Sequence, residues 1–148
     1  MIKRLYETHI NVLDLDRAMA FYSRLPDFEV GYVDWERRIA FYFIGGWGHS
    51  MLGVWEKPAA EVLPLHLAFE VDLADLAGAI AQLKALGIQP LDFQQAPGDA
   101  PVVFSWMPAA GIYFKDPDGN LLEFIAMLPG APQPARGLTT LEDWGDGG

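Results

Sequence analysis

Apolar and polar residues alternate near the start of the chain and then change to a helical spacing. Residues 6–13 alternate around Ile10 and Val12, which predicts a strand. Asp14 is a favourable helix N-cap. An apolar stripe at helical spacing follows it, formed by Leu15, Ala18, Met19, Tyr22 and Leu25. Pro26 ends this helix, and further strands are expected over residues 28–33, 38–44 and 51–55.

The same order of patterns then returns. Residues 65–71 predict a strand, and Asp72 begins a second helix over residues 73–86. Strands follow at 88–93 and 102–106, and a hairpin is expected at 111–127, with its turn at Asp116-Pro117-Asp118-Gly119. This internal duplication predicts an α+β fold of two tandem βαβββ modules, a curved mixed sheet forming a cup with the helices outside. The module boundaries are expected at residues 1–60 and 61–128.

The composition changes after Leu128. Residues 129–148 are rich in proline and glycine, which predicts a C-terminal tail without a core of its own. Three apolar residues in this tail, Leu138, Leu141 and Trp144, are candidates for packing on a partner. Together with the resemblance described below, these residues favour a homodimer.

Composition excludes several classes of function. The net charge of −10 argues against nucleic-acid binding, which needs a basic face, although it would tolerate a cationic ligand. The absence of cysteine excludes disulfides and thiolate ligands. No apolar run approaches the roughly 20 residues that span a membrane. The polar N-terminal segment is unlike a signal peptide, so we expect no membrane association and a cytoplasmic protein.

Three polar residues lie on otherwise apolar predicted strands. His9 and His66 open the two copies, and Glu123 interrupts the last strand. A single strand histidine is more often a hydrogen-bonded core residue than a ligand, and a strand glutamate is more often exposed. Two histidines at similar places in two copies could, however, face one cavity together with the carboxylate. Two imidazoles and one carboxylate suit a divalent Fe, Mn, Zn or Ni ion and leave positions open for a substrate.

The chain resembles the vicinal oxygen chelate superfamily, which includes glyoxalase I, extradiol dioxygenases, fosfomycin-resistance enzymes and bleomycin-resistance proteins. The resemblance covers roughly residues 5–128. It rests on His9-Ile10-Asn11-Val12 with the Asp14-Leu15 helix start, on His66-Leu67-Ala68-Phe69-Glu70-Val71, and on Tyr113-Phe114-Lys115-Asp116-Pro117-Asp118-Gly119 with Glu123. It implies paired βαβββ modules around a metal ion, whose ligand positions fall on His9, His66 and Glu123.

Departures from the family patterns bear on the reaction. Glyoxalase I has a fourth ligand, a glutamate whose position falls on Gly53, and the nearby Glu56 would point to the opposite face unless the strand register shifts. Extradiol dioxygenases resemble the hairpin around Tyr113, but the histidine expected before that tyrosine is absent. Tyr113 could donate a hydrogen bond to substrate or simply pack in the strand. Glu56, Glu70 or Glu123 itself could serve as the general base, and the sequence does not choose among them.

Two further branches of the superfamily match the charge of the chain to different degrees. Fosfomycin enzymes bind an anionic phosphonate and need nearby cations, but Arg136 is the only basic residue after Lys115 and lies in the tail. Bleomycin-resistance proteins bind a cationic drug without a metal, and in that alternative both histidines are structural. We predict a metal-dependent enzyme, of lyase, isomerase or dioxygenase type, acting on a small-molecule substrate that chelates the metal through adjacent oxygens. The sequence does not choose the metal, the substrate, or a site within one chain over a site shared in a dimer.

Overall fold

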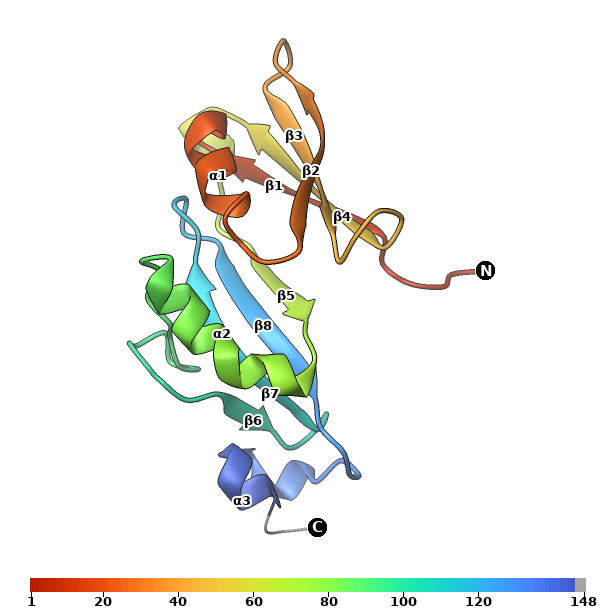
Figure 1. Ribbon diagram of the computed structural model, residues 1–148, viewed down its shortest axis with the longest axis vertical. Coiled ribbons are helices and arrows are strands. Elements are labelled where there is room, and N and C mark those ends of the chain that lie inside the picture. The colour runs from red at the N-terminus through yellow and green to blue at the C-terminus, as the bar shows by residue number, and fades with distance from the viewer. Residues whose placement is uncertain (146–148) are drawn as a thin grey trace. The chain divides into compact units, whose positions relative to one another are not determined.

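The computed structural model describes residues 1–145 as two compact units (Figure 1). The first unit comprises Met1–Leu65 together with Asp116–Asn120, and the second comprises His66–Lys115 and residues 121–145. Within the described residues, no helix has the length and apolar character needed to cross a membrane. Each unit is built around one mixed sheet and is described by itself below.

The first unit contains one helix packed on a four-stranded sheet. Its elements, in chain order, are β1 (Glu7–Val12), α1 (Leu15–Tyr22), β2 (Phe28–Asp34), β3 (Ile39–Ile44), β4 (Ser50–Glu56) and the 3₁₀ turn η1 (Ala59–Glu61). The sheet order is β1-β4-β3-β2, with β1 and β4 parallel and the other pairs antiparallel. The predicted N-cap is confirmed, because the Asp14 carboxylate accepts the Arg17 backbone N–H at 2.8 Å.

Alternation along β1 decides which of its side chains reach the core. Ile10 and Val12 are buried, as are Leu15 and Ala18 on α1. The intervening residues of β1 face the other side of the sheet, since successive side chains of a strand point to opposite faces. The exposed surface of this sheet therefore begins with Glu7 and His9.

The second unit repeats this arrangement and adds one strand. It contains β5 (His66–Glu70), α2 (Leu73–Ala85), β6 (Val102–Phe104), β7 (Ala109–Lys115), β8 (Leu121–Met127) and β9 (Leu138–Thr139), in the sheet order β5-β8-β7-β6-β9. The pair β5 and β8, at one end of this order, is parallel, like β1 and β4. Helix α2 packs on β7 and β8 (Figure 1). The predicted α+β class is confirmed, and each unit has a mixed sheet of its own where the sequence predicted one curved mixed sheet.

The strand expected at residues 88–93 is reduced to isolated bridges at Leu91, which pairs with Tyr113 and with Pro97. Pro90 has no N–H to give to a ladder, which disfavours a regular strand before Leu91. After it, the Asp92 carboxylate accepts the backbone N–H groups of Gln94 and Ala96, at 2.8 and 3.0 Å, which closes a tight turn. The segment therefore contributes a single paired residue and not a strand.

The segment after Leu128, expected from the sequence to be a tail, folds onto the second unit. It forms η2 (Pro134–Arg136), β9 and the short helix α3 (Leu141–Gly145). Strand β9 pairs with β6, and Trp144 is buried with its indole N–H donated to the carbonyl of Pro129 at 3.2 Å. Residues 146–148, the end of the expected tail, lie outside the described residues.

The turn between β7 and β8 belongs to the first unit, although both strands belong to the second. The buried Asp116 carboxylate accepts the backbone N–H groups of Asp118 and Asn120, the Asn120 side-chain amide, and the hydroxyl of Tyr22, all at 2.7–2.9 Å. Asp118 accepts the Arg17 guanidinium at 2.7 Å. Burial, and then the Asp116 carboxylate, raise the pKa of the Tyr22 hydroxyl, which therefore stays protonated and can donate.

Candidate functional site

The strands β5 and β8 bring His66 and Glu123 together on one face of the second sheet. His66 begins β5 and pairs with Leu121, while Glu123 lies two residues further along β8. Residues two apart on a strand share a face, so the side chains can meet. His66 Nε2 lies 3.2 Å from Glu123 Oε2. The histidine side chain is 48% exposed and the glutamate side chain 4%, so the carboxylate is the buried partner.

Hydrogen bonding fixes the orientation of the His66 ring. Its Nδ1 lies 3.1 Å from the backbone carbonyl oxygen of Leu121, and because a carbonyl can only accept, Nδ1 carries the proton. In the neutral ring Nε2 is then a bare lone pair, which faces the Glu123 oxygen. Two acceptors at this distance need a shared cation, either a proton or a metal ion. A ring held by Nδ1–H···O=C is also the usual arrangement of a metal-binding histidine.

The Glu123 carboxylate is buried with part of its bonding capacity unused. Its Oε1 atom is buried and has no hydrogen-bond partner among the described residues. Gly111 on β7 makes room for this oxygen, since a Cβ added there would clash with Oε1. Burial raises the pKa of Glu123, although the neighbouring His66 opposes the shift. A buried carboxylate with an unpaired oxygen beside a bare imidazole nitrogen fits a metal ion.

Tyr113 lies beside this pair. It is the cross-strand neighbour of Glu123, and its ring centroid is 5.8 Å from that of His66. Burial, and then the Glu123 carboxylate, raise the pKa of the Tyr113 hydroxyl above its usual value. The phenol therefore remains protonated at neutral pH and can act as a hydrogen-bond donor next to the pair.

His9 has a different environment, on β1 in the first unit. Its Nε2 lies 2.7 Å from Glu7 Oε1, and its ring stacks on Trp55 with centroids 5.4 Å apart. The ring lies over Gly53, where an added Cβ would be 2.8 Å from the His9 ring carbon Cδ2. Gly53 thus provides the space that His9 occupies. The carboxylate partner Glu7 was not among the residues singled out from the sequence, although alternation places it on the His9 face.

Glu56 lies on the α1 side of the sheet. It is an odd number of residues from Gly53, and its Oε2 accepts the Leu15 backbone N–H at 2.8 Å and the Arg38 guanidinium at 2.7 Å. The Arg38 guanidinium lowers the pKa of Glu56, so this carboxylate is ionised and bound at the start of α1. Its predicted catalytic role stays a prediction, and these contacts give it a structural role.

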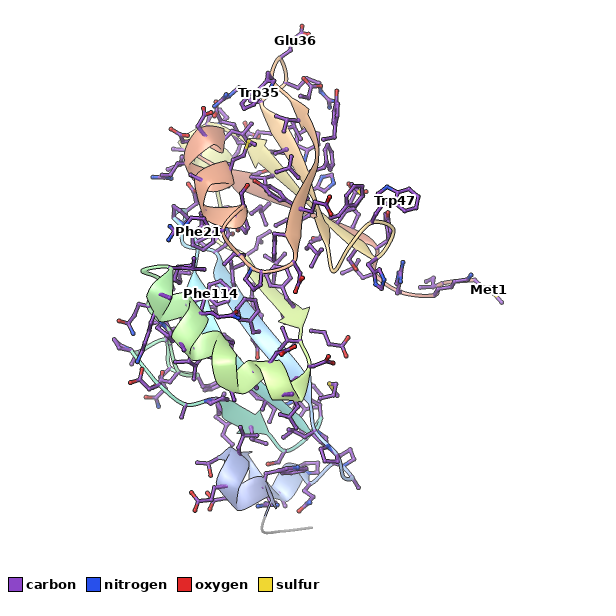
Figure 2. All side chains as sticks on the ribbon, viewed as in Figure 1. Met1, Phe21, Trp35, Glu36, Trp47 and Phe114 are labelled. Atoms are coloured by element: carbon purple, nitrogen blue, oxygen red, sulfur yellow. The ribbon has the colours of Figure 1, made fainter. Side chains whose placement is uncertain are left out.

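Aromatic side chains accompany His9 on the first sheet. Phe41 contacts the His9 ring edge-on at 5.9 Å between centroids, and Tyr32 stacks on Phe41 at 6.5 Å. Trp47 projects from the loop between β3 and β4 and is 81% exposed, while Trp35 lies next to Glu36 in the β2–β3 turn (Figure 2). The exposed face of the first sheet therefore offers flat apolar surface beside an imidazole.

The structure thus brings some of the predicted site residues together within one unit. His66, Glu123 and Tyr113 meet in the second unit, whereas His9 lies with Glu7 in the first. Within either unit, no group of three or more His, Asp or Glu side chains among the described residues has the spacing of a metal site. The triad of His9, His66 and Glu123 therefore stays a prediction, supported in the second unit by the donor geometry.

Several solved structures have a similar fold over most of the chain. An integron cassette protein from the mobile metagenome of the Halifax Harbour sewage outfall is 29% identical, with 85% of this chain and 100% of that chain covered and a TM-score of 0.75. The oxidase ChaP-H2 is 20% identical, covering 90% and 100%, with a TM-score of 0.70. The fosfomycin resistance protein FosX from Listeria monocytogenes, solved with Mn(II) and sulfate, is 24% identical, covering 86% and 93%, with a TM-score of 0.63.

The latter two similarities show the fold alone. A match that covers most of the sequence shows the family directly, because the family model spans residues 4–124 and so includes both repeats and Glu123. The chain belongs to the glyoxalase/bleomycin resistance protein/dioxygenase superfamily.

Proposed function

We propose that this protein is a metal-dependent enzyme acting on a small substrate that binds the metal through two adjacent oxygens, in a lyase, isomerase or ring-cleaving reaction. The observation that carries the proposal is the His66–Glu123 pair. His66 Nε2 and a buried oxygen of Glu123 face one another at 3.2 Å, and the second carboxylate oxygen has no partner among the described residues. A divalent cation would satisfy these atoms together.

The spacing of the pair supports this reading. Two ligands each about 2.1 Å from one ion, at right angles, are about 3.0 Å apart. The His66–Glu123 separation is close to that value. His66 and Glu123 would hold the ion, with His9 as the third ligand expected from the sequence. The ion would supply Lewis-acid polarisation of the two substrate oxygens.

The chain's own groups would perform the remaining tasks. Tyr113, protonated and adjacent to Glu123, would donate a hydrogen bond to a substrate oxygen. The Leu121 carbonyl would keep the His66 ring in the tautomer that leaves Nε2 free.

Metal analysis of protein purified without added metal tests the proposal, followed by EDTA treatment and reloading with Fe(II), Mn(II), Ni(II) or Zn(II). Each form would be assayed on methylglyoxal–thiol adducts and on catechols. We expect stoichiometric binding of at least one of these metals, and turnover that depends on it. His66→Ala should remove both metal binding and turnover. The remaining histidine, His49, is exposed, and His49→Ala should change neither.

A binding protein of the bleomycin-resistance type is the second candidate. It is favoured by the net charge of −10 and by the carboxylate partner that each of His9 and His66 already has. In that case both histidines would be protonated partners in ion pairs, and the aromatic surface would receive a cationic ligand. Calorimetric titration with bleomycin separates the candidates: binding without any bound metal favours this one, and metal-dependent turnover excludes it.

A further inference from the structure

We propose that Phe93 is a specificity-determining residue, which selects a substrate carrying an aryl or similarly bulky neutral group beside its metal-binding oxygens. This inference rests on the proposed metal-dependent function and names the class of substrate. It uses residues of the second unit alone. It follows from a break in the strand pairing of the second sheet, at the place where the chain enters β6.

The pairing partners of β7 reveal this break. Tyr113 pairs with Leu91 through two backbone hydrogen bonds, of 2.7 and 3.1 Å, whereas Gly111 pairs with Val102. In an unbroken ladder, residues two apart on one strand meet residues two apart on its neighbour. Here the two partners, residues 91 and 102, are eleven apart, which is nine more than an unbroken strand allows. Residues 92–101, called the excursion below, therefore leave and rejoin a single line of strand.

The start of the excursion is fixed by its own backbone contacts. Leu91 bridges to Pro97 as well as to β7, and the Asp92 backbone N–H donates to the carbonyl of Ala96 at 2.8 Å. The Asp92 carboxylate closes the same turn from the other side by accepting two backbone N–H groups. Phe93 lies inside this closed turn, so its backbone is held in place before any substrate binds.

The Phe93 ring extends a buried apolar cluster outward. It meets the Phe104 ring edge to face, with the centroids 6.0 Å apart and the planes at 64°. Phe104 forms one cluster with Leu91 and Tyr113, all three at most 9% exposed. Phe93 is 51% exposed. It therefore offers ring surface to a ligand at the margin of the cluster.

The cluster begins directly beside the candidate metal ligands. Glu123 pairs with Tyr113, and Tyr113 pairs with Leu91, so these three side chains share one face of the sheet. Neighbouring strands are about 4.8 Å apart, which places Leu91 about 10 Å from Glu123 along this line. A substrate whose oxygens bind at the His66–Glu123 pair would reach the cluster and Phe93 with a phenyl-sized substituent. A methyl group would end short of Phe93.

The chemistry of the cluster favours a neutral substituent. The partly buried side chains packed against it are those of Val102, Met107 and Leu121, which are apolar. A charged group placed among them would lose its water without gaining a partner. An aryl ring would instead make ring-to-ring contacts with Phe93 and Phe104, which favour edge-to-face geometry. We therefore assign the substrate an aryl or comparably bulky neutral group.

The test compares two small chelators that bind a metal through the same two adjacent oxygens, acetohydroxamate and benzohydroxamate. Their Kd values are measured by calorimetry on the Mn(II)-loaded full chain and on its Phe93→Ala and Leu73→Ala variants. We expect the native chain to prefer benzohydroxamate, and Phe93→Ala to lower this preference by about 3–10-fold, as expected for a lost aromatic contact. The Kd for acetohydroxamate should stay within about twofold, because its methyl group does not reach Phe93.

Leu73→Ala is the matched control for loss of an exposed apolar side chain. Leu73 is 41% exposed and begins α2, whereas the last turn of α2 binds the excursion through Lys84 and Asp99, at 2.7 Å. Its variant should keep the native preference. Phe93→Leu retains an apolar side chain and should lower the preference by less than Phe93→Ala does. Far-UV circular dichroism checks folding, and Phe93→Leu carries the test if Phe93→Ala does not fold.

The ratio of the two Kd values separates a specificity role from a structural one, because general damage to the site would weaken both chelators alike. A native chain without a preference for benzohydroxamate would overturn the inference, as would an unchanged preference in the folded Phe93 variants. Either result would leave the metal-dependent function standing. A native chain that binds neither Mn(II) nor the chelators would instead refute the metal-dependent function, and this inference with it.

Discussion

Replacing Glu123 by glutamine should stabilise the metal-free protein. In the native chain Oε2 of the buried carboxylate faces Nε2 of His66, and because Nδ1 of the neutral ring holds the proton, two acceptors meet there. The glutamine amide has the same shape without the charge, and its NH₂ group can donate to Nε2. Leaving one buried polar atom unsatisfied costs about 1–3 kcal/mol. We therefore expect the free energy of unfolding of the metal-free variant to exceed the native value by about that amount.

Bound metal should make the native chain more stable than the Glu123→Gln variant. At a free Mn(II) concentration of 100 times the Kd, the native chain gains about 2.7 kcal/mol, whereas the variant, lacking the ligand, gains little. The assay is urea denaturation followed by tryptophan fluorescence, with EDTA and with Mn(II). Glu29→Gln, which removes an exposed charge on β2, is the control. A metal-free Glu123→Gln protein less stable than the native chain would refute the reasoning, since it would reveal a protonated His66 in an ion pair with Glu123.

Further expectations concern pH, the turn network and assembly. Burial raises the pKa of Glu123, so the folded state holds the proton of this carboxyl more tightly than the unfolded state does. The free energy of unfolding of the native chain in EDTA should therefore fall as pH rises from near 4.5 through the raised pKa, and this fall should vanish in Glu123→Gln. Tyr22→Phe removes one donor from the buried Asp116 carboxylate and should lower the free energy of unfolding by about 1.5–3 kcal/mol in urea titrations, whereas Tyr32→Phe, on an exposed ring, should not. Light scattering should give about twice the chain mass of 16.4 kDa if the protein is the homodimer we propose; a monomer at micromolar concentration contradicts it.

Much of the fold was predictable because the repeated strand–helix order depends on local patterns. The stripes of α1 and α2 and the N-cap Asp14 follow from spacing alone. The strand expected at residues 88–93 was not formed, since its proline and the Asp92 turn outweigh its apolar character. The packing of Trp144 on the second unit depends on contacts distant in sequence, and proline-rich composition gives no signal for it.

The candidate site was predictable only in part for a related reason. Glu123 and His66 stood out because each is polar within an apolar strand, and the structure places them in contact. Their meeting depends on the parallel register of β5 and β8, which spacing along the chain does not determine. Glu7 was overlooked because it lies at the first residue of β1, where the alternation begins and an exposed glutamate carries no signal of its own.

The turn at Asp116–Asn120 has a consequence for the evolutionary history of the chain. A gene duplication would be expected to yield two halves that can be separated again, by cleavage or as two genes. Here the second repeat inserts its hairpin turn into the first unit, where Tyr22 donates to Asp116 and Arg17 binds Asp118. A fragment starting at residue 66 would carry this turn without those partners. The two halves have become mutually dependent, and recombination within the family should exchange whole chains more readily than single modules.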